Sequence, residues 1–196
     1  MLIQVKSKGR IFTLSGISGS GKSHLLKHVL ATRDDFERLK TVTTRPMREG
    51  ELNGVDKYFI TLAEFEYLHK QKEFEAVKEI YGNMYTFFTK DIQKYSNGTN
   101  LISEYYYQDV PRFKIAYPAT KSIYLLPRNI MRALDEIDRR GLDLKEKKKR
   151  KLDITSELAF IKTENGQQSF DKLIINTYDE QPLNEMSNFI ASILTS

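Results

Sequence analysis

The chain contains no cysteine among its 196 residues, so disulfide bonds and thiolate metal ligands are excluded and no function can rest on a thiol. It also lacks any apolar run of about eighteen residues, the length that a membrane-spanning helix needs, and no apolar stretch follows a basic start at the N-terminus. We therefore expect neither a membrane span nor an export signal, and a cytoplasmic location. Internal repeats and low-complexity linkers are absent too, which indicates a single globular domain.

Positive charge is the most uneven feature of the composition. The formal net charge is +5, and the excess is concentrated in the run KEKKKRK from Lys145 to Lys151. Such a run is either a solvated helix face or a binding patch for polyanions. No aromatic residue interleaves with it, which argues against a stacking platform for single-stranded nucleic acid. Nucleotide phosphates would satisfy the same charge, so nucleic acid is not the expected partner. The oligomeric state stays open.

Hydrophobic periodicity along the chain alternates between strand-like and helix-like segments. Arg10–Gly16 is a short apolar strand, and Lys22–Arg33 has apolar residues at helical spacing. Gly82 and Asn83 interrupt another apolar segment in the manner of a hairpin turn. This alternation predicts an α/β fold with a mainly parallel sheet covered by helices on both faces. Further strands are expected at residues 57–61, 98–107, 120–127 and 170–178, and further helices at 62–74, 129–162 and 182–194.

A glycine-rich turn separates the first strand from the first helix. Gly16, Gly21, Lys22 and Ser23 fit the pattern G-x-x-x-x-G-K-[ST], in the strand–loop–helix context that this motif requires. The glycines allow backbone N–H groups to surround phosphate oxygens at the N-terminus of the helix. Lys22 is predicted to reach the terminal phosphates, and the Ser23 hydroxyl to bind Mg²⁺. A purely structural glycine turn is the alternative, and the context favours a nucleoside triphosphate site.

A second polar stretch, TTRPMREGELNG from Thr43 to Gly54, holds two arginines three residues apart. The guanidinium groups of Arg45 and Arg48 offer paired planar donors, which suit a phosphate dianion better than two ammonium groups would. On its own, such an R-x-x-R loop is usually only solvated charge. Here it follows a phosphate loop, and the two stretches together indicate a second phosphate site.

The segment TTRPMREGELNGVDKYF resembles the guanylate kinase family, whose corresponding pattern is T-T-R-x-P-R-x-G-E-x-N-G-x-D-Y-x-F. The resemblance continues in YGNMY, in IDRRGLDLKEKKKRKLDITSELAF and in FDKLIINTYDE, and covers nearly the whole chain in the right order. It implies a P-loop NTPase fold with an inserted acceptor-binding lobe and a helical lid. Within one domain spanning 1–196, we expect the core at about 1–36, 97–130 and 158–196, the acceptor lobe at about 37–96 and the lid at about 131–157.

The resemblance also implies a set of site residues. Arg45, Arg48 and Tyr85 match the clamp on the acceptor phosphate. Three residues lie near the lid arginines: Arg139, Arg140 and Arg150. The catalytic residues are then Lys22, Arg45, Arg140 and Arg150. The implied ATP-binding residues are Gly16, Ser18, Gly19, Ser20, Gly21, Lys22, Ser23, His24 and Asn176, with Ser23 on the metal. The implied acceptor-binding residues are Thr41, Arg45, Arg48, Glu51, Tyr58, Tyr85 and Glu104.

Several positions depart from the family pattern. Counting back from Gly82 places Ala76 where the family has a guanine-reading glutamate, and Phe87 replaces a small hydroxyl residue. Of a D-x-D pair, only one carboxylate remains, as Glu104, and Tyr106 takes the second position. A buried base edge without polar partners binds poorly. The sequence therefore predicts an intact phosphate grip and makes GMP a doubtful acceptor.

The expected function is a magnesium- and ATP-dependent phosphotransferase of guanylate kinase type, acting on a phosphate monoester. A nucleoside monophosphate is the first choice of acceptor, with a guanine-like or another base, and a sugar phosphate is an alternative. A catalytically inactive guanylate kinase-like binding module is a second alternative, although such modules usually have a degraded phosphate loop. A nucleic-acid-dependent ATPase is a third and rests mainly on the basic run.

Overall fold

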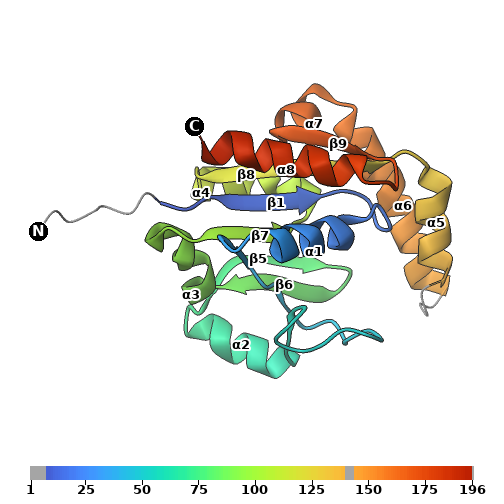
Figure 1. Ribbon diagram of the computed structural model, residues 1–196. Helices are drawn as coiled ribbons and strands as arrows, with labels where there is room; N and C mark the ends of the chain where they lie inside the picture. The colour runs from blue at the N-terminus through green and yellow to red at the C-terminus, as the bar shows by residue number, and fades with distance from the viewer. Residues whose placement is uncertain (1–7, 140–143, 196) are drawn as a thin grey trace, which may run out of the picture. The chain divides into compact units, whose positions relative to one another are not determined.

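The computed structural model describes residues 8–139 and 144–195 (Figure 1). The chain divides into two compact units. One contains the described residues before Ile11 together with Asp35–Ser103, and the other contains Ile11–Asp34 together with the chain from Glu104 onward. No helix in the described part of the chain is long and apolar enough to cross a bilayer.

The second unit is built on three parallel strands in the order β1-β8-β9. All five side chains of β1 (Ile11–Ser15) are buried, and β8 (Thr120–Pro127) is almost as enclosed. Such continuous apolar runs are typical of parallel strands that are covered on both faces. Helix α8 (Gln181–Leu194) and helix α4 (Val110–Ala116) lie on opposite faces of these strands (Figure 1). The third strand is β9 (Lys172–Asn176). Helix α1 (Lys22–Thr32) contacts α8.

Two long helices complete this unit. They are α5 (Ile130–Arg139) and α6 (Leu144–Ile161), which contact each other. The buried side chains of α6 recur every three or four residues, which is the spacing of one helix face. Ile154 from this face packs with Ile17 of the glycine loop and with two side chains of α5, Ala133 and Ile137. The apolar face of α6 therefore reaches the loop that follows β1. The short elements are α7 (Glu164–Gln168) and the 3₁₀ helix η2 (Tyr107–Asp109).

The first unit contains a four-stranded sheet in the order β4-β3-β6-β5. Strands β5 (Phe74–Ile80) and β6 (Asn83–Phe88) form an antiparallel hairpin, and β3 (Val42–Thr43) joins β6 antiparallel and β4 (Tyr58–Phe59) parallel. Helix α2 (Leu62–Lys70) covers one face, with Phe65 packed against Val42 and Phe74. A parallel pair, β2 (Phe36–Arg38) and β7 (Asn100–Glu104), completes the unit with α3 (Thr89–Ile92) and η1 (Gln93–Asn97).

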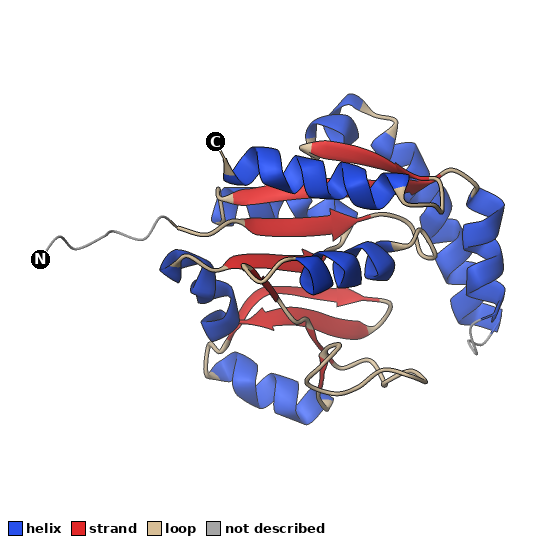
Figure 2. Ribbon diagram, in the orientation of Figure 1, coloured by secondary structure: helices blue, strands red, loops and turns tan. Residues whose placement is uncertain are grey.

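The observed architecture confirms the predicted α/β class with a mainly parallel sheet and covering helices (Figure 2). The predicted hairpin is also confirmed, with its two-residue turn at Tyr81 and Gly82, one residue earlier than expected. Two helical segments differ from expectation. The helix expected to run to Phe74 ends at Lys70, because Lys72 has a positive φ of 60° and Phe74 already belongs to β5. The single segment expected over 129–162 contains two helices, α5 and α6.

Candidate active site

The loop from Gly16 to Ser23 connects β1 to α1 through three glycines with positive φ. At all three a Cβ would come too close to another group, and on Gly19 it would lie 2.7 Å from the Ala133 carbonyl oxygen. A Cβ on Gly16 would lie 2.3 Å from the Leu125 carbonyl oxygen, and one on Gly21 would lie 2.5 Å from Nδ2 of Asn176. These contacts are too short for a side chain, so the loop conformation depends on glycine at these positions.

Two side chains hold the backbone of this loop. The Lys22 ammonium donates to the carbonyl oxygens of Gly16 and Ile17 over 2.6 and 2.8 Å. Asn176, the last residue of β9, donates from Nδ2 to the Ser20 carbonyl oxygen over 2.8 Å. The predicted ATP-binding residues Lys22 and Asn176 are thus brought to the same loop, from elements far apart in the sequence.

The end of the loop presents two oxygen ligands side by side. The Ser23 hydroxyl donates to Oε1 of Glu104 over 2.7 Å, and Ser23 is exposed whereas Glu104 is half-buried. Hydroxyl and carboxylate oxygens are the ligand types that Mg²⁺ prefers. His24, also predicted for this site, is an exposed residue in the first turn of α1. In the described part of the chain, no group of three or more His, Asp or Glu side chains is arranged so that it could hold a metal ion.

The predicted lid arginines are only partly described. Arg140 lies outside the described residues. Arg150 is 9% exposed, and its Nη2 and Nε atoms donate to Oε1 of Glu146 over 2.7 and 3.1 Å. Its guanidinium group therefore pairs with a carboxylate four residues earlier on the same helix.

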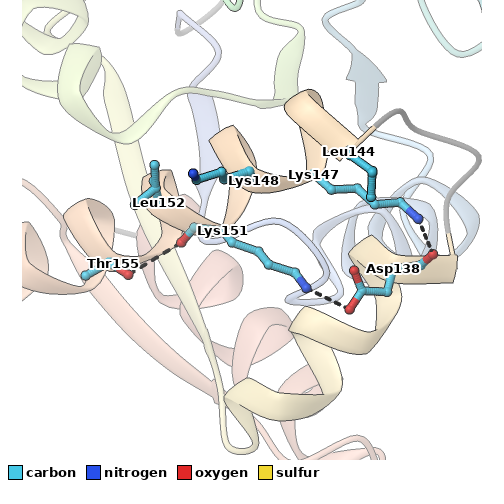
Figure 3. A pocket seen from close by; sticks show the side chains of 7 residues that line it. All are labelled: Asp138, Leu144, Lys147, Lys148, Lys151, Leu152 and Thr155. Carbon is cyan, nitrogen blue, oxygen red and sulfur yellow. Dashed lines mark hydrogen bonds and ion pairs between the residues drawn. The ribbon is translucent and has the colours of Figure 1, made fainter.

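The basic run lies on α6, and apart from Arg150 its side chains are exposed or half-buried. A groove of about 420 Å³ lies at this helix. Figure 3 shows Lys147 and Lys151 reaching from α6 to Asp138 on α5. Lys147 donates to the Asp138 carbonyl oxygen and Lys151 to its carboxylate, each over 2.8 Å. These contacts fit the simpler interpretation of the run as a solvated helix face with local ion pairs. The groove is lined by Asp138, Leu144, Lys147, Lys148, Lys151, Leu152 and Thr155.

In the first unit, Glu51 organises the arginine loop. One carboxylate oxygen accepts from Nη2 of Arg45 over 2.7 Å, and the other accepts from the backbone N–H of Arg48 over 2.8 Å. Burial acts to raise the pKa of Glu51, but these hydrogen bonds and the charges of Arg45 and Arg48 together outweigh it, so the pKa lies below its ordinary value. The charged carboxylate thereby fixes Arg45, which is 8% exposed, and shapes the turn that carries Arg48.

The clamp tyrosine lies on the same sheet face as the start of this loop. Tyr85 pairs directly with Thr43, and paired residues place their side chains on one face. Arg45 lies two residues beyond Thr43, and its backbone N–H donates to the Thr43 hydroxyl. Thr41 is buried near the start of β3. Arg45 and Tyr85 therefore both lie next to Thr43, and their role as an acceptor-phosphate clamp stays a prediction.

Tyr58 does not join this group. It pairs with Val42, and its ring packs edge-on against Phe88 in the apolar cluster on the other face of the sheet. The next residue, Phe59, pairs with Thr43, and its ring centre lies 5.3 Å from the Arg45 guanidinium. Because strand side chains alternate, the one-residue shift of the tyrosine relative to the family pattern turns it to the opposite face.

A β-bulge changes which residue of β5 faces the clamp. Lys78 pairs with Tyr85, but Glu75 pairs with Phe87, so Ala76 and Val77 together oppose the single residue Thr86. Ala76 has a positive φ of 55°. In the register of Lys78 and Tyr85, an unbulged strand would place Ala76 opposite Phe87. The extra residue instead places Glu75 there, on the face that carries Tyr85.

The remaining departures are packed into the protein. Phe87 is 2% exposed. The Tyr106 ring lies 4.8 Å from that of Tyr107, and its hydroxyl donates to Asp153 over 3.2 Å. Phe87 is therefore part of the buried core, and Tyr106 packs, partly buried, against the cluster of Tyr107 and Tyr124. Sequence reasoning missed two carboxylates: Glu75, which only the bulge reveals, and Glu157, a buried residue of α6.

Comparison with known proteins is consistent with this geometry. Residues 8–193 match the family model described as guanylate kinase. A guanylate kinase of Neisseria gonorrhoeae is 34% identical over 146 residues, which are 74% of this chain and 71% of that protein. One of Francisella tularensis subsp. holarctica is 30% identical over 192 residues, covering 95% of this chain and 98% of the relative. The crystal structure of guanylate kinase from Anaplasma phagocytophilum matches with a TM-score of 0.71 at 24% identity, covering 95% of this chain and 87% of that one, and supports the fold.

Proposed function

The chain belongs to the guanylate kinase family and is a nucleoside monophosphate kinase, and from this premise we propose that it transfers the γ-phosphoryl group of ATP to GMP. The observation that carries the proposal is Glu75. The bulge in β5 gives this carboxylate the position opposite Phe87 that counting along the sequence had given to Ala76. The doubt about GMP rested in part on that count, beside the replacements at Phe87 and Tyr106. The relatives give no support to an inactive binding module or to a sugar-phosphate kinase.

The donor is ATP, held on the glycine loop. Backbone N–H groups of the loop and the N-terminus of α1 bind the phosphates. Lys22 leaves the carbonyl oxygens of Gly16 and Ile17 and neutralises charge on the phosphoryl group as it transfers. Gly16, Ser18, Gly19, Ser20, Gly21, Ser23, His24 and Asn176 complete the proposed ATP site.

Magnesium accompanies the nucleotide. The Ser23 hydroxyl and the Glu104 carboxylate, 2.7 Å apart, would hold it, since both are hard oxygen ligands at the end of the phosphate loop. The bound cation supplies charge neutralisation and helps to orient the phosphates. The Ser23–Glu104 hydrogen bond keeps the two ligands together beforehand.

The acceptor phosphate is held by Arg45, Arg48 and Tyr85 in the lobe of residues 37–96, which lies wholly within the first unit. Charge-assisted contacts of this type each contribute about 1.5 to 3 kcal/mol. Thr41 and Glu51 support the site, the latter by fixing Arg45. A phosphate dianion is already a nucleophile, so catalysis consists of positioning and charge stabilisation and needs no general base. Arg150, and Arg140 beyond the described residues, are proposed to add positive charge from the lid at 131–157.

The proposed guanine contact is tested with Glu75→Gln. The variant should lower kcat/KM for GMP by about 10²-fold, because the amide lacks the charge that strengthens hydrogen bonds to the base. Glu79→Gln is the matched control, since Glu79 lies on the same strand and is exposed. Unchanged kcat/KM for GMP in Glu75→Gln, with the folded state intact, would contradict the assignment of Glu75.

A further inference from the structure

Glu157 occupies a position in α6 where an apolar side chain is expected. It lies on the buried face of the helix between Ile154 and Ile161, and it is 5% exposed. Its Oε1 atom has no hydrogen-bond partner among the described residues, and neither does the buried hydroxyl of Tyr124. A buried carboxyl group with an unpaired oxygen is costly, so its place on this face calls for a role other than packing.

The groups around this carboxyl come from four elements. On one side of it, Ile154 packs with Ile17, whose carbonyl oxygen accepts from the Lys22 ammonium of α1. On the other side, Ile161 packs with Tyr124 of β8 and Tyr107 of η2. The charges of Lys22 and of Asp153, which lies on the same helix, act on the carboxyl group. Tyr124 lies close enough to favour the charged carboxylate electrostatically without forming a hydrogen bond of good geometry. Lys22 supplies the positive charge among these groups, and it is also the lysine of the phosphate-loop motif.

Burial raises the pKa of Glu157 and the charge of Asp153 adds to this effect, whereas Lys22 and Tyr124 lower the pKa, and the net result is a pKa of about 7. The carboxyl group therefore exchanges its proton in the neutral range. Any change in the charge near Lys22 will therefore change the fraction of Glu157 that is protonated.

We propose that Glu157 is a positioning residue for Lys22, and that it takes up a proton from solvent when the polyphosphate of a nucleotide binds to the loop. The inference rests on the proposed ATP site. In the free protein, the carboxylate attracts the ammonium of Lys22. Incoming phosphates add negative charge and compete for the same ammonium, so the charged carboxylate is disfavoured and becomes protonated. The neutral carboxyl then leaves Lys22 to the phosphates. Apart from the O–H bond that forms on the Glu157 carboxyl group, no covalent bond forms or breaks.

Calorimetric titration of the full chain with Mg-ATP, without acceptor, tests this coupling. The observed heat at pH 7 is measured in buffers of different ionisation enthalpy, and its slope gives the number of protons taken up. We expect wild type to take up a fraction of a proton, up to about one half. Glu157→Gln should lose that uptake, and its affinity for Mg-ATP should vary less between pH 6 and 8 than that of wild type.

Two further variants separate this role from a structural one. Glu157→Asp keeps the carboxyl group and should keep proton uptake even if its affinity falls. Glu136→Gln removes an exposed carboxylate of α5 and should behave like wild type. Equal proton uptake by wild type and Glu157→Gln, with Mg-ATP bound by both, overturns this inference and leaves the ATP site standing. Failure of wild type to bind Mg-ATP overturns both.

Discussion

The side chain of Asn176 donates a hydrogen bond of 2.8 Å to the carbonyl oxygen of Ser20, 156 residues earlier in the chain. The bond is buried, and it fixes the phosphate loop to the end of β9. The Nδ2 atom of Asn176 also lies 2.5 Å from the position that a Cβ on Gly21 would take, so the amide and the glycine fit each other closely. The loop thus depends on the second half of the chain for its shape.

Replacement of Asn176 by Ala should therefore weaken both the fold and the ATP site. The Ser20 carbonyl would lose its partner in a buried setting, which costs about 1 to 3 kcal/mol. Chemical denaturation should show this loss, and the dissociation constant for Mg-ATP should rise about tenfold or more. Asn184→Ala, an exposed position on α8, is the control and should change neither quantity. An Asn176→Ala variant that binds Mg-ATP as wild type does would show that the loop holds its shape without this bond.

Lys22→Ala should abolish phosphoryl transfer and leave the protein folded, because the ammonium acts on phosphate charge at a half-buried position. We expect a loss of at least about 10²-fold in kcat, the scale of one preorganised charged donor. Circular dichroism and a coupled assay for ADP release measure the two effects. Lys27→Ala, on the exposed side of the same helix, should keep full activity. Turnover near the wild-type value in Lys22→Ala would exclude Lys22 from catalysis.

The buried carboxyl group of Glu157 makes the stability of the protein depend on pH. Its pKa rises from 4.5 in the unfolded chain to about 7 in the folded protein, so the folded state holds more protons between these values. Its contribution to the free energy of unfolding is therefore greatest at low pH and declines as pH rises through this window, by roughly 3 kcal/mol in all. Glu157→Gln has no such group. It should match wild type near pH 5 and exceed it near pH 8.

Urea denaturation of wild type, Glu157→Gln and Glu136→Gln at several pH values measures this difference. The exposed control should follow wild type throughout. A constant offset between wild type and Glu157→Gln from pH 5 to pH 8 would mean that Glu157 does not titrate in this range.

Local patterns predicted much of the fold and of the phosphate loop. The loop motif can be recognised in the sequence because its glycines, Lys22 and Ser23 act together with the backbone around them. The alternation of strands and helices follows from the periodicity of apolar residues. The position of Glu75 was not predictable in this way. A bulge adds one residue to a strand without a clear local signal in the sequence. The side chains of that strand that precede the bulge are then turned to the other face of the sheet.

Two other outcomes depend on tertiary packing. Tyr58 pairs with Val42 and packs on Phe88, which only the register of the short strands β3 and β4 determines. In the sequence, Glu157 does not differ from the other charged residues of its helix. Its importance appears only when α6 packs its buried face against the loop and β8.

The central claim is that GMP is the acceptor, and a panel of acceptors tests it most directly. Initial rates of nucleoside diphosphate formation should be measured with Mg-ATP and GMP, dGMP, AMP, CMP, UMP or a sugar phosphate, with the products resolved by chromatography. The account predicts that kcat/KM for GMP exceeds that for AMP and the pyrimidine nucleotides by at least about 10²-fold, the discrimination expected of a site that hydrogen-bonds the base. A higher kcat/KM for AMP, a pyrimidine nucleotide or the sugar phosphate than for GMP would contradict it.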